Sequence, residues 1–141
     1  MIEIENLGDV ICQGDQMRSW LFRQMRESHE SGNHFASFLT LSVLAEQAVR
    51  ERADSIDGDY PVALKSLVGD GVIGEAETTP LLALKNMQTA VSNMYMHSPD
   101  MSVTFAADGE DVAYPYGEET TYEEFMKLHM MTILRIVAKI V

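Results

Sequence analysis

The segment from about His34 to Ala53 is the part of the sequence that most constrains the fold. Its apolar residues occur at helical intervals on nearly every side of the predicted helix, and they are Phe35, Phe38, Leu39, Leu41, Val43, Leu44 and Ala45. A helix that has little polar face must be surrounded by other elements. A small chain meets this requirement most simply by packing further helices around it. We therefore expect this segment to be the central helix of an all-α domain.

Four further helices are indicated by apolar spacing and by helix-start signals. They are expected over about Asp15 to Glu30, from Pro61 to about Val68, from Thr79 to Ser98, and from Thr121 to the C-terminus. Thr79 precedes a proline, as a helix N-cap often does, and Thr121-x-x-Glu124 has the spacing of a capping box. The predicted fold is an antiparallel bundle of about five helices, forming one domain over residues 1–141.

The segment from Met101 to Tyr116 has a different pattern. Two short apolar stretches flank Asp108-Gly109, a dipeptide that is common in tight hairpin turns. We expect a small hairpin-like insertion before the last helix. The predicted core of the domain consists of Phe35, Phe38, Leu39, Leu44, Leu84, Val91, Leu128 and Leu134.

The acidic charge of the chain is unevenly distributed. The formal net charge is −12, and no Lys or Arg lies between Lys85 and Lys127. Phosphate backbones are bound mainly by Lys and Arg, so direct nucleic-acid binding is disfavoured. Either this interval is a solvated face that maintains solubility, or it is a patch that binds a basic partner. The candidate interaction residues are Asp108, Glu110, Asp111, Glu118 and Glu119.

The cellular setting is indicated by what the sequence lacks. Cys12 is the single cysteine, which excludes an intramolecular disulfide and a cysteine-based metal site. The N-terminus has no signal-peptide pattern, and the apolar tail from Ile133 to Val141 is too short to cross a bilayer. We expect a cytoplasmic protein without a membrane partner.

Candidate chemistry is concentrated near the end of the fourth predicted helix. Asn93 and His97 lie four residues apart and so share one helix face, where an imidazole beside an amide could perform acid–base chemistry or merely cap the helix. Glu46, within the apolar central helix, could pair with His97 or lie at the solvent edge. His29 and His34 bracket a turn and are better explained as surface residues than as metal ligands. No phosphate-binding loop is present, so we expect no cofactor and no metal.

Three features between Phe35 and His97 together resemble the HEPN superfamily, especially its compact DUF4145-like members. An apolar helix contains an internal glutamate, Glu46. The stretch Leu67-Val-Gly-Asp-Gly-Val-Ile then leads into a long helix, which ends in Ser92-Asn-Met-Tyr-Met-His. The resemblance covers roughly the middle half of the chain, and it implies a helical fold. The Phe38-Leu-Thr-Leu helix and Gly71-Val-Ile also resemble mannitol-operon repressor-like proteins, which are helical regulators.

The HEPN resemblance implies both an activity and a reason to doubt it. In that family, Arg-Asn-x-x-x-His motifs of two subunits meet at a dimer interface and cleave RNA, with the histidine acting on the ribose 2′-OH. The residues that match are His97 and Asn93, with Glu46 as the internal glutamate. Ser92 occupies the arginine position, and a hydroxyl cannot supply a fixed charge to a phosphate. The motif is therefore degenerate.

These observations together predict a non-catalytic HEPN-like regulatory or interaction protein that binds another protein through its acidic surface. The partner would be basic or itself nucleic-acid-binding. The broad apolar faces of the second and last predicted helices favour a homodimer. Three alternatives stay open: a metal-independent HEPN ribonuclease of toxin or defence type, a phage or mobile-element inhibitor of a nucleic-acid-binding protein, and a mannitol-operon repressor-like regulator.

Overall fold

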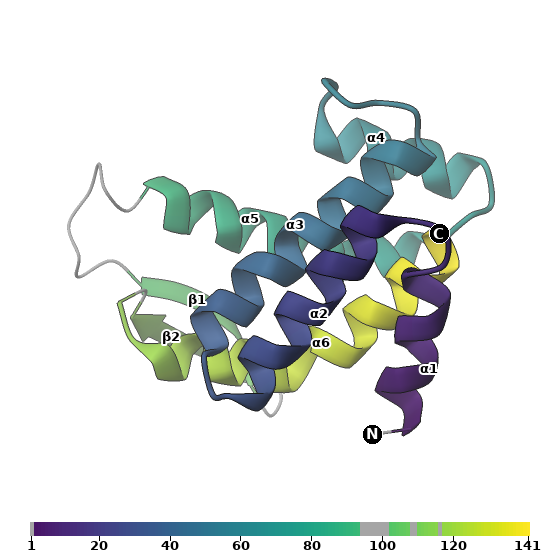
Figure 1. Ribbon diagram of the computed structural model, residues 1–141. Helices are drawn as coiled ribbons and strands as arrows, with labels where there is room; N and C mark the ends of the chain where they lie inside the picture. Colours follow the sequence, from purple (N-terminus) through teal and green to yellow (C-terminus); the bar gives the residue numbers. More distant parts are fainter. Residues whose placement is uncertain (1, 94–101, 108–109, 116) are drawn as a thin grey trace.

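The computed structural model describes residues 2–93, 102–107, 110–115 and 117–141. Within them, the chain is an all-α bundle with one antiparallel hairpin before the last helix, as predicted (Figure 1). The elements are α1 (Ile2–Ile11), α2 (Gln16–Glu30), α3 (His34–Arg52), α4 (Tyr60–Gly69), the 3-10 turn η1 (Glu75–Glu77), α5 (Thr78–Ser92), β1 (Ser102–Ala107), β2 (Glu110–Pro115) and α6 (Glu119–Ile140). None of the helices in these ranges is both long enough and apolar enough to span a membrane.

Helix α3 is the centre of the bundle, as its composition predicted. It contacts α2, α4, α5 and α6, and its fully buried side chains include Phe38, Leu41, Leu44 and Val49. Helices α2 and α5 run antiparallel to α3. Helix α6 runs parallel to it, because the start of α6 contacts the start of α3 and the Arg52 guanidinium donates to the carbonyl of Ile140, 2.9 Å away.

The predicted core is mostly correct. Phe38, Leu44, Leu84, Val91 and Leu134 are buried, and Phe35 and Leu39 are partly buried against the same cluster. Leu128 was wrongly assigned to the core, since it is 36% exposed. The buried stripe of α6 runs through Phe125, Ile133 and Val137 instead, and Leu128 lies beside it.

Two of the predicted helix starts are confirmed by side-chain caps. The Asp15 carboxylate accepts from the backbone N–H of Arg18 at 2.9 Å and begins α2. Asp59 likewise accepts from Val62 N–H at 3.4 Å, with Pro61 in the first turn of α4. Each carboxylate satisfies one of the backbone donors that a helix start leaves unpaired.

The predicted starts at Thr79 and Thr121 were wrong, because an adjoining turn and a tertiary contact replace the expected caps. Helix α5 begins at Thr78, directly after η1, so Thr79 lies inside the helix. Helix α6 begins at Glu119, and the hydroxyl of Thr121 donates to the carbonyl of Pro115 at the end of β2. Thr121 is buried in this contact and does not form a capping box.

Helix α1 was not predicted. Its ten residues include three acidic ones and a glycine, so its helical pattern is weak. Ile4 and Ile11 are nevertheless buried, and Arg135 of α6 forms an ion pair with Glu3, with 2.6 Å between Nε and Oε1. Gly8 allows the helix to approach Phe22 closely, since a Cβ at this position would lie 2.6 Å from the ring. Helix α1 therefore covers part of α6.

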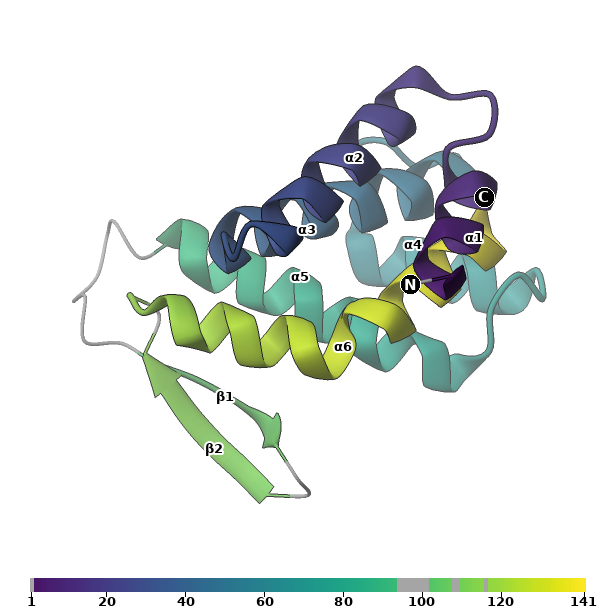
Figure 2. The same ribbon diagram turned by 60° about the horizontal axis from the view of Figure 1, so that its bottom comes forward.

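The hairpin projects from the N-terminal end of α6. Strands β1 and β2 pair in register from Ser102↔Pro115 to Ala107↔Glu110, which confirms the predicted insertion. Figure 2 shows the two strands extending away from the helical body. The turn residues Asp108 and Gly109 lie outside the described residues. The four described residues at the start of β2, Glu110 to Ala113, are all exposed.

Candidate functional site

The predicted motif lies at the end of α5, and part of it lies outside the described residues. Helix α5 ends at Ser92, with Asn93 as its exposed C-cap, whereas the prediction extended it to Ser98. His97 falls in the undescribed range 94–101. The Ser92 hydroxyl donates to the carbonyl of Gln88 at 3.0 Å and accepts from Gln88 Nε2 at 3.2 Å. The residue at the arginine position is therefore bonded within its own helix.

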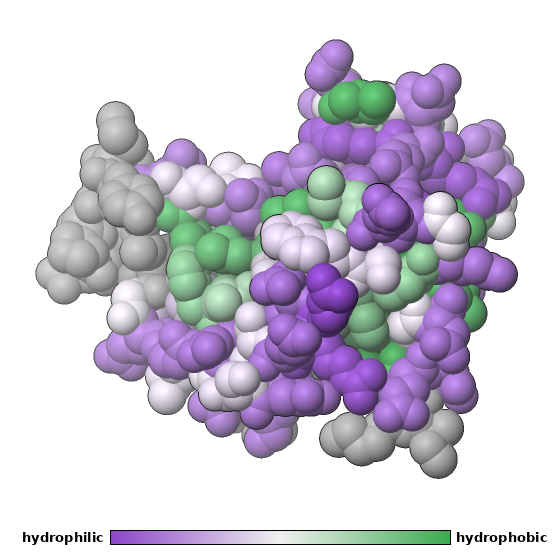
Figure 3. All heavy atoms as spheres, viewed as in Figure 1, coloured by the Kyte–Doolittle hydropathy of each residue, from purple (hydrophilic) through white to green (hydrophobic). Residues whose placement is uncertain are grey.

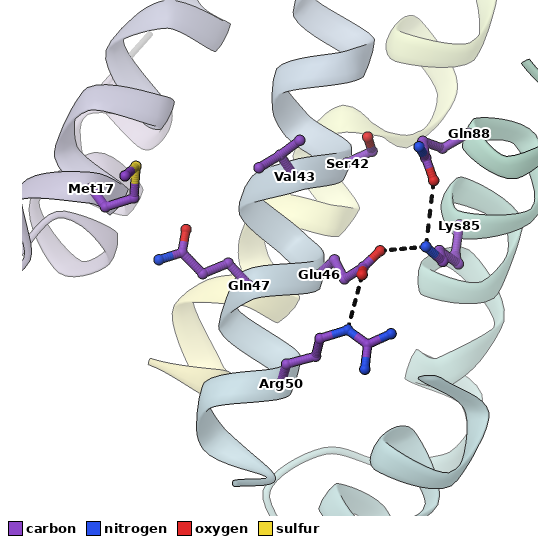
Figure 4. A pocket seen from close by; sticks show the side chains of 8 residues that line it. All are labelled: Met17, Ser42, Val43, Glu46, Gln47, Arg50, Lys85 and Gln88. Atoms are coloured by element: carbon purple, nitrogen blue, oxygen red, sulfur yellow. Dashed lines mark hydrogen bonds and ion pairs between the residues drawn. The ribbon is translucent and has the colours of Figure 1, made fainter. Parts of the chain in front are cut away.

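Glu46 lies in a half-buried charged cluster between α3 and α5. Its Oε1 is 2.6 Å from Lys85 Nζ, and its Oε2 is 2.9 Å from Arg50 Nε (Figure 4). The Glu46 carboxylate is therefore only partly exposed to solvent, and it already has two cationic partners without a histidine. Burial alone would raise the pKa of Glu46, but the hydrogen bonds from Lys85 and Arg50 outweigh this effect and hold the pKa below its ordinary value.

The same cluster also connects α3 to the loop before α4 and to the start of α4. Arg50 Nη1 donates to the carbonyls of Gly58, at 2.6 Å, and Ser55, at 3.3 Å. The buried ring of Tyr60 lies 5.6 Å from the Arg50 guanidinium carbon and 5.9 Å from Lys85 Nζ. Burial, and then the charge of Glu46, raise the pKa of the Tyr60 hydroxyl. An ionised Glu46 held by two cations is suited to joining helices and is poorly suited to acid–base catalysis.

An open hollow of about 530 Å³ lies beside this cluster. Its lining comes from three helices and consists of Met17, Ser42, Val43, Glu46, Gln47, Arg50, Lys85 and Gln88 (Figure 4). Sequence reasoning identified Glu46 alone among these residues as a candidate for chemistry. The contact between Glu46 and Lys85 joins positions 39 residues apart, so no local pattern could have revealed it.

The acidic candidates lie on the hairpin and at the start of α6. Glu110 and Asp111 are exposed on β2, and Glu118 is exposed just before α6. Glu119 is exposed too, but its Oε1 accepts from the backbone N–H of Phe35 at 2.9 Å. Because Asn33, the N-cap of α3, forms no side-chain cap of its own, Glu119 supplies one. Asp108 lies outside the described residues.

His29 and His34 are adjacent across the turn between α2 and α3. Their ring centroids are 5.6 Å apart in an edge-to-face arrangement. The Nδ1 atom of each ring is buried without a hydrogen-bond partner. Burial lowers the pKa of His29, and the neighbouring His34 lowers it further. In the described ranges, no three His, Cys, Asp or Glu residues are grouped so that they could hold a metal ion.

Comparison with known proteins found no matching family, no matching curated protein and no matching solved structure. The function is therefore argued from the arrangement of this chain's own residues. Two surfaces carry that argument. One is the acidic hairpin with the start of α6, and the other is the hollow between α2, α3 and α5.

Proposed function

We propose that this protein is a non-catalytic, HEPN-like regulatory or interaction protein. It binds a basic protein partner through an acidic surface defined by Glu110 and Asp111 of β2 and Glu118 beside α6. One observation carries the proposal: these exposed carboxylates lie on and beside a hairpin that projects from the bundle, within an interval free of Lys and Arg. A projecting surface of one charge sign attracts and orients an oppositely charged partner.

The distribution of cations supports a protein partner over nucleic acid. Six of the basic side chains form ion pairs with carboxylates of the same chain, and they are Arg18, Arg26, Arg50, Lys85, Arg135 and Lys139. A cation already paired with a carboxylate gains less from a phosphate, because the existing contact must first be lost. Direct binding of RNA or DNA is therefore disfavoured at this charge balance.

The condition of the motif at the end of α5 supports the non-catalytic part of the proposal. Phosphate chemistry benefits from a fixed bidentate cation. Here the equivalent position is Ser92, whose hydroxyl is bonded to Gln88 of its own helix. Glu46, the internal glutamate of the resemblance, is occupied by Lys85 and Arg50. In this proposal the protein acts in the cytoplasm, with its single cysteine reduced.

The test is an affinity purification from native-host lysate over a series of salt concentrations. We expect a basic partner that is retained at low salt and released as salt rises, because screening weakens the attraction. The variant Glu110→Lys/Asp111→Lys/Glu118→Lys should lose this partner. The matched control Asp9→Lys/Asp57→Lys/Asp70→Lys makes the same charge change at exposed positions on other surfaces, and it should retain the partner. Equal loss from both variants would show that net charge, and not the hairpin surface, determines binding.

A further inference from the structure

A second surface, distinct from the acidic hairpin, has the composition of a protein interface. Three apolar side chains are about half exposed on neighbouring helices: Met17 at 52% and Trp20 at 50% on α2, and Val43 at 52% on α3. Figure 3 shows apolar side chains exposed in the region between α3 and α5. Trp, Met and Arg are enriched at the centres of protein interfaces, where most charged residues are depleted. Three residues of these types, Met17, Trp20 and Arg50, lie on this face.

The shape of this face is that of a groove with α3 as its floor. Met17 from α2 lines one side of the hollow, Val43 lies on the floor, and Gln88 of α5 lines the other side. The flanking helices α2 and α5 run antiparallel to α3, so the groove follows the axis of α3. An amphipathic helix that binds in a hydrophobic groove uses anchors spaced by three or four residues. Met17 provides an apolar wall on the α2 side, and Trp20, three residues further along α2, is about half exposed.

The charge at one end of the groove indicates which charged group the occupant should carry there. Lys85 and Arg50 share the single carboxylate of Glu46, so this end carries two cations against one anion. The other polar residues that line the hollow, Ser42, Gln47 and Gln88, are uncharged. A carboxylate on the occupant would therefore be favoured near Lys85 and Arg50, whereas a cation would be repelled.

We infer that the groove between α2 and α5 binds one amphipathic helix of a partner protein. The helix places apolar side chains against Met17, Trp20 and Val43 and a carboxylate beside Lys85. A second copy of this chain is disfavoured as the occupant, because the apolar stripes of α1, α5 and α6 are buried in its own core. This site is independent of the acidic surface proposed above.

The test uses a phage-displayed library of helical peptides, panned against the unaltered protein with the Val43→Glu variant present as soluble competitor. We expect the enriched peptides to carry apolar residues at i, i+3 or i+4, and i+7, together with at least one Glu or Asp. The fluorescence of Trp20, the only tryptophan in the chain, should shift to shorter wavelength on binding. Its indole leaves water when the groove is filled.

Variants locate the binding site within the groove. Val43→Glu should weaken the selected peptides at least about tenfold, because it places a charge in the apolar centre. The matched control is Val62→Glu, at a valine of α4 that is 60% exposed, and it should leave affinity unchanged. Lys85→Glu should weaken the acidic peptides, and a peptide whose Glu is replaced by Lys should bind this variant better than the parent peptide does. Circular dichroism verifies that each variant remains helical.

Three results would overturn the inference. The first is an absence of enriched peptides, and the second is enrichment of peptides that bind Val43→Glu as well as the unaltered protein. The third is self-association in sedimentation experiments that Val43→Glu abolishes, which would assign the groove to a second copy. Peptide binding here should weaken only partly as salt rises, because its apolar contacts are not screened, whereas binding at the acidic hairpin should be lost. Failure of either proposal can therefore be recognised separately.

Discussion

The carboxylate of Glu119, at the start of α6, accepts a hydrogen bond from the backbone N–H of Phe35, at the start of α3, with 2.9 Å between Oε1 and N. The two residues are 84 positions apart in the sequence. The side chain of Asn33 does not cap the central helix α3. Glu119 of the last helix provides this cap instead. This single contact joins the start of α6 to the start of α3 and helps to set their parallel arrangement.

Replacing Glu119 should reveal the strength of this cap. We expect Glu119→Ala to lower the free energy of unfolding by about 1 kcal/mol, the usual cost of losing a helix cap. Glu118→Ala removes the neighbouring exposed carboxylate, which forms no cap, and should change stability by less than about 0.5 kcal/mol. Urea denaturation followed by circular dichroism measures both values. Equal effects of the two substitutions would contradict a specific role for Glu119.

The aromatic cluster around Phe38 should dominate the stability of the bundle. The Phe38 ring is fully buried and lies 5.5 Å from the Phe125 ring and 5.1 Å from the Tyr122 ring. Phe38→Ala should cost about 3–5 kcal/mol, because it removes a large side chain and leaves a cavity. Leu128→Ala, at a half-exposed position of α6, should cost much less. An unchanged melting temperature for Phe38→Ala would show that α3 is not central.

Local patterns predicted the helices well and predicted the contacts between them poorly. Helical apolar spacing located α2, α3 and α4, and the Asp15 and Asp59 caps form within one turn of their partners. Thr121 was misassigned because a residue outside the helix, Pro115, competes for its hydroxyl. Helix α1 was missed because its burial depends on α6, at the other end of the chain.

The same distinction applies to the candidate site, where a local feature was recognisable in the sequence and a long-range contact was not. Glu46 could be recognised as unusual because it interrupts an apolar helix. Its partner Lys85 could not be recognised from the sequence, because only the packing of α5 against α3 brings Lys85 close to Glu46. Nothing in the sequence distinguished the exposed residues Met17, Trp20 and Val43 from buried apolar residues. Apolar spacing does not specify which side of a central helix is left uncovered.

Acidification should destabilise the protein through two half-buried histidines, His29 and His129. Burial lowers the folded-state pKa of both His29 and His129 below the ordinary value of 6.5. The unfolded chain therefore binds more protons, and stability falls as pH decreases through 6.5 toward the folded-state pKa. Between pH 7.5 and 5.5, where most carboxylates remain ionised, each histidine contributes less than about 1.4 kcal/mol per pH unit.

Histidine variants identify the source of this pH dependence. His29→Gln and His129→Gln should each reduce the loss of unfolding free energy between pH 7.5 and 5.5, as measured by urea denaturation at the two pH values. Glu123→Gln, at an exposed position of α6, is the control and should leave the slope unchanged. A histidine variant with the full slope of the unaltered protein would exclude that histidine as the source.

The exposed apolar surface that is available to form the predicted homodimer is smaller than the sequence suggested. Helix α1 covers part of α6, and α3 contacts four other helices. Leu128 and Met131 remain at least partly exposed on α6, about one turn apart. If they form the interface, light scattering should show a dimer at tens of micromolar that Leu128→Glu dissociates and Val43→Glu does not. A monomer without concentration dependence in this range would remove the dimer.

The unaltered protein should show no ribonuclease activity. In the proposed resemblance to HEPN proteins, Ser92 takes the arginine position of the motif, and its hydroxyl is hydrogen-bonded to Gln88. Losing a charge-assisted contact to a phosphate is worth about 1.5–3 kcal/mol, or one to two decades in rate or affinity. The nearby carboxylates add a repulsion that weakens as salt rises. Residual RNA binding should therefore improve slightly with salt, opposite to the behaviour of a cationic RNA-binding surface.

Restoring the missing cation tests whether the site is dormant or absent. Ser92→Arg should create some cleavage of a fluorescently labelled RNA if the remaining groups are competent, and the additional change His97→Ala should then abolish it. Ser66→Arg, which makes the same change at an exposed position of α4, controls for a general gain in RNA affinity. If the unaltered protein cleaves RNA and His97→Ala abolishes this activity, the non-catalytic proposal is wrong and the HEPN-type ribonuclease alternative replaces it. The acidic surface would then be explained by solubility alone, because a ribonuclease must admit the phosphate backbone that these carboxylates repel.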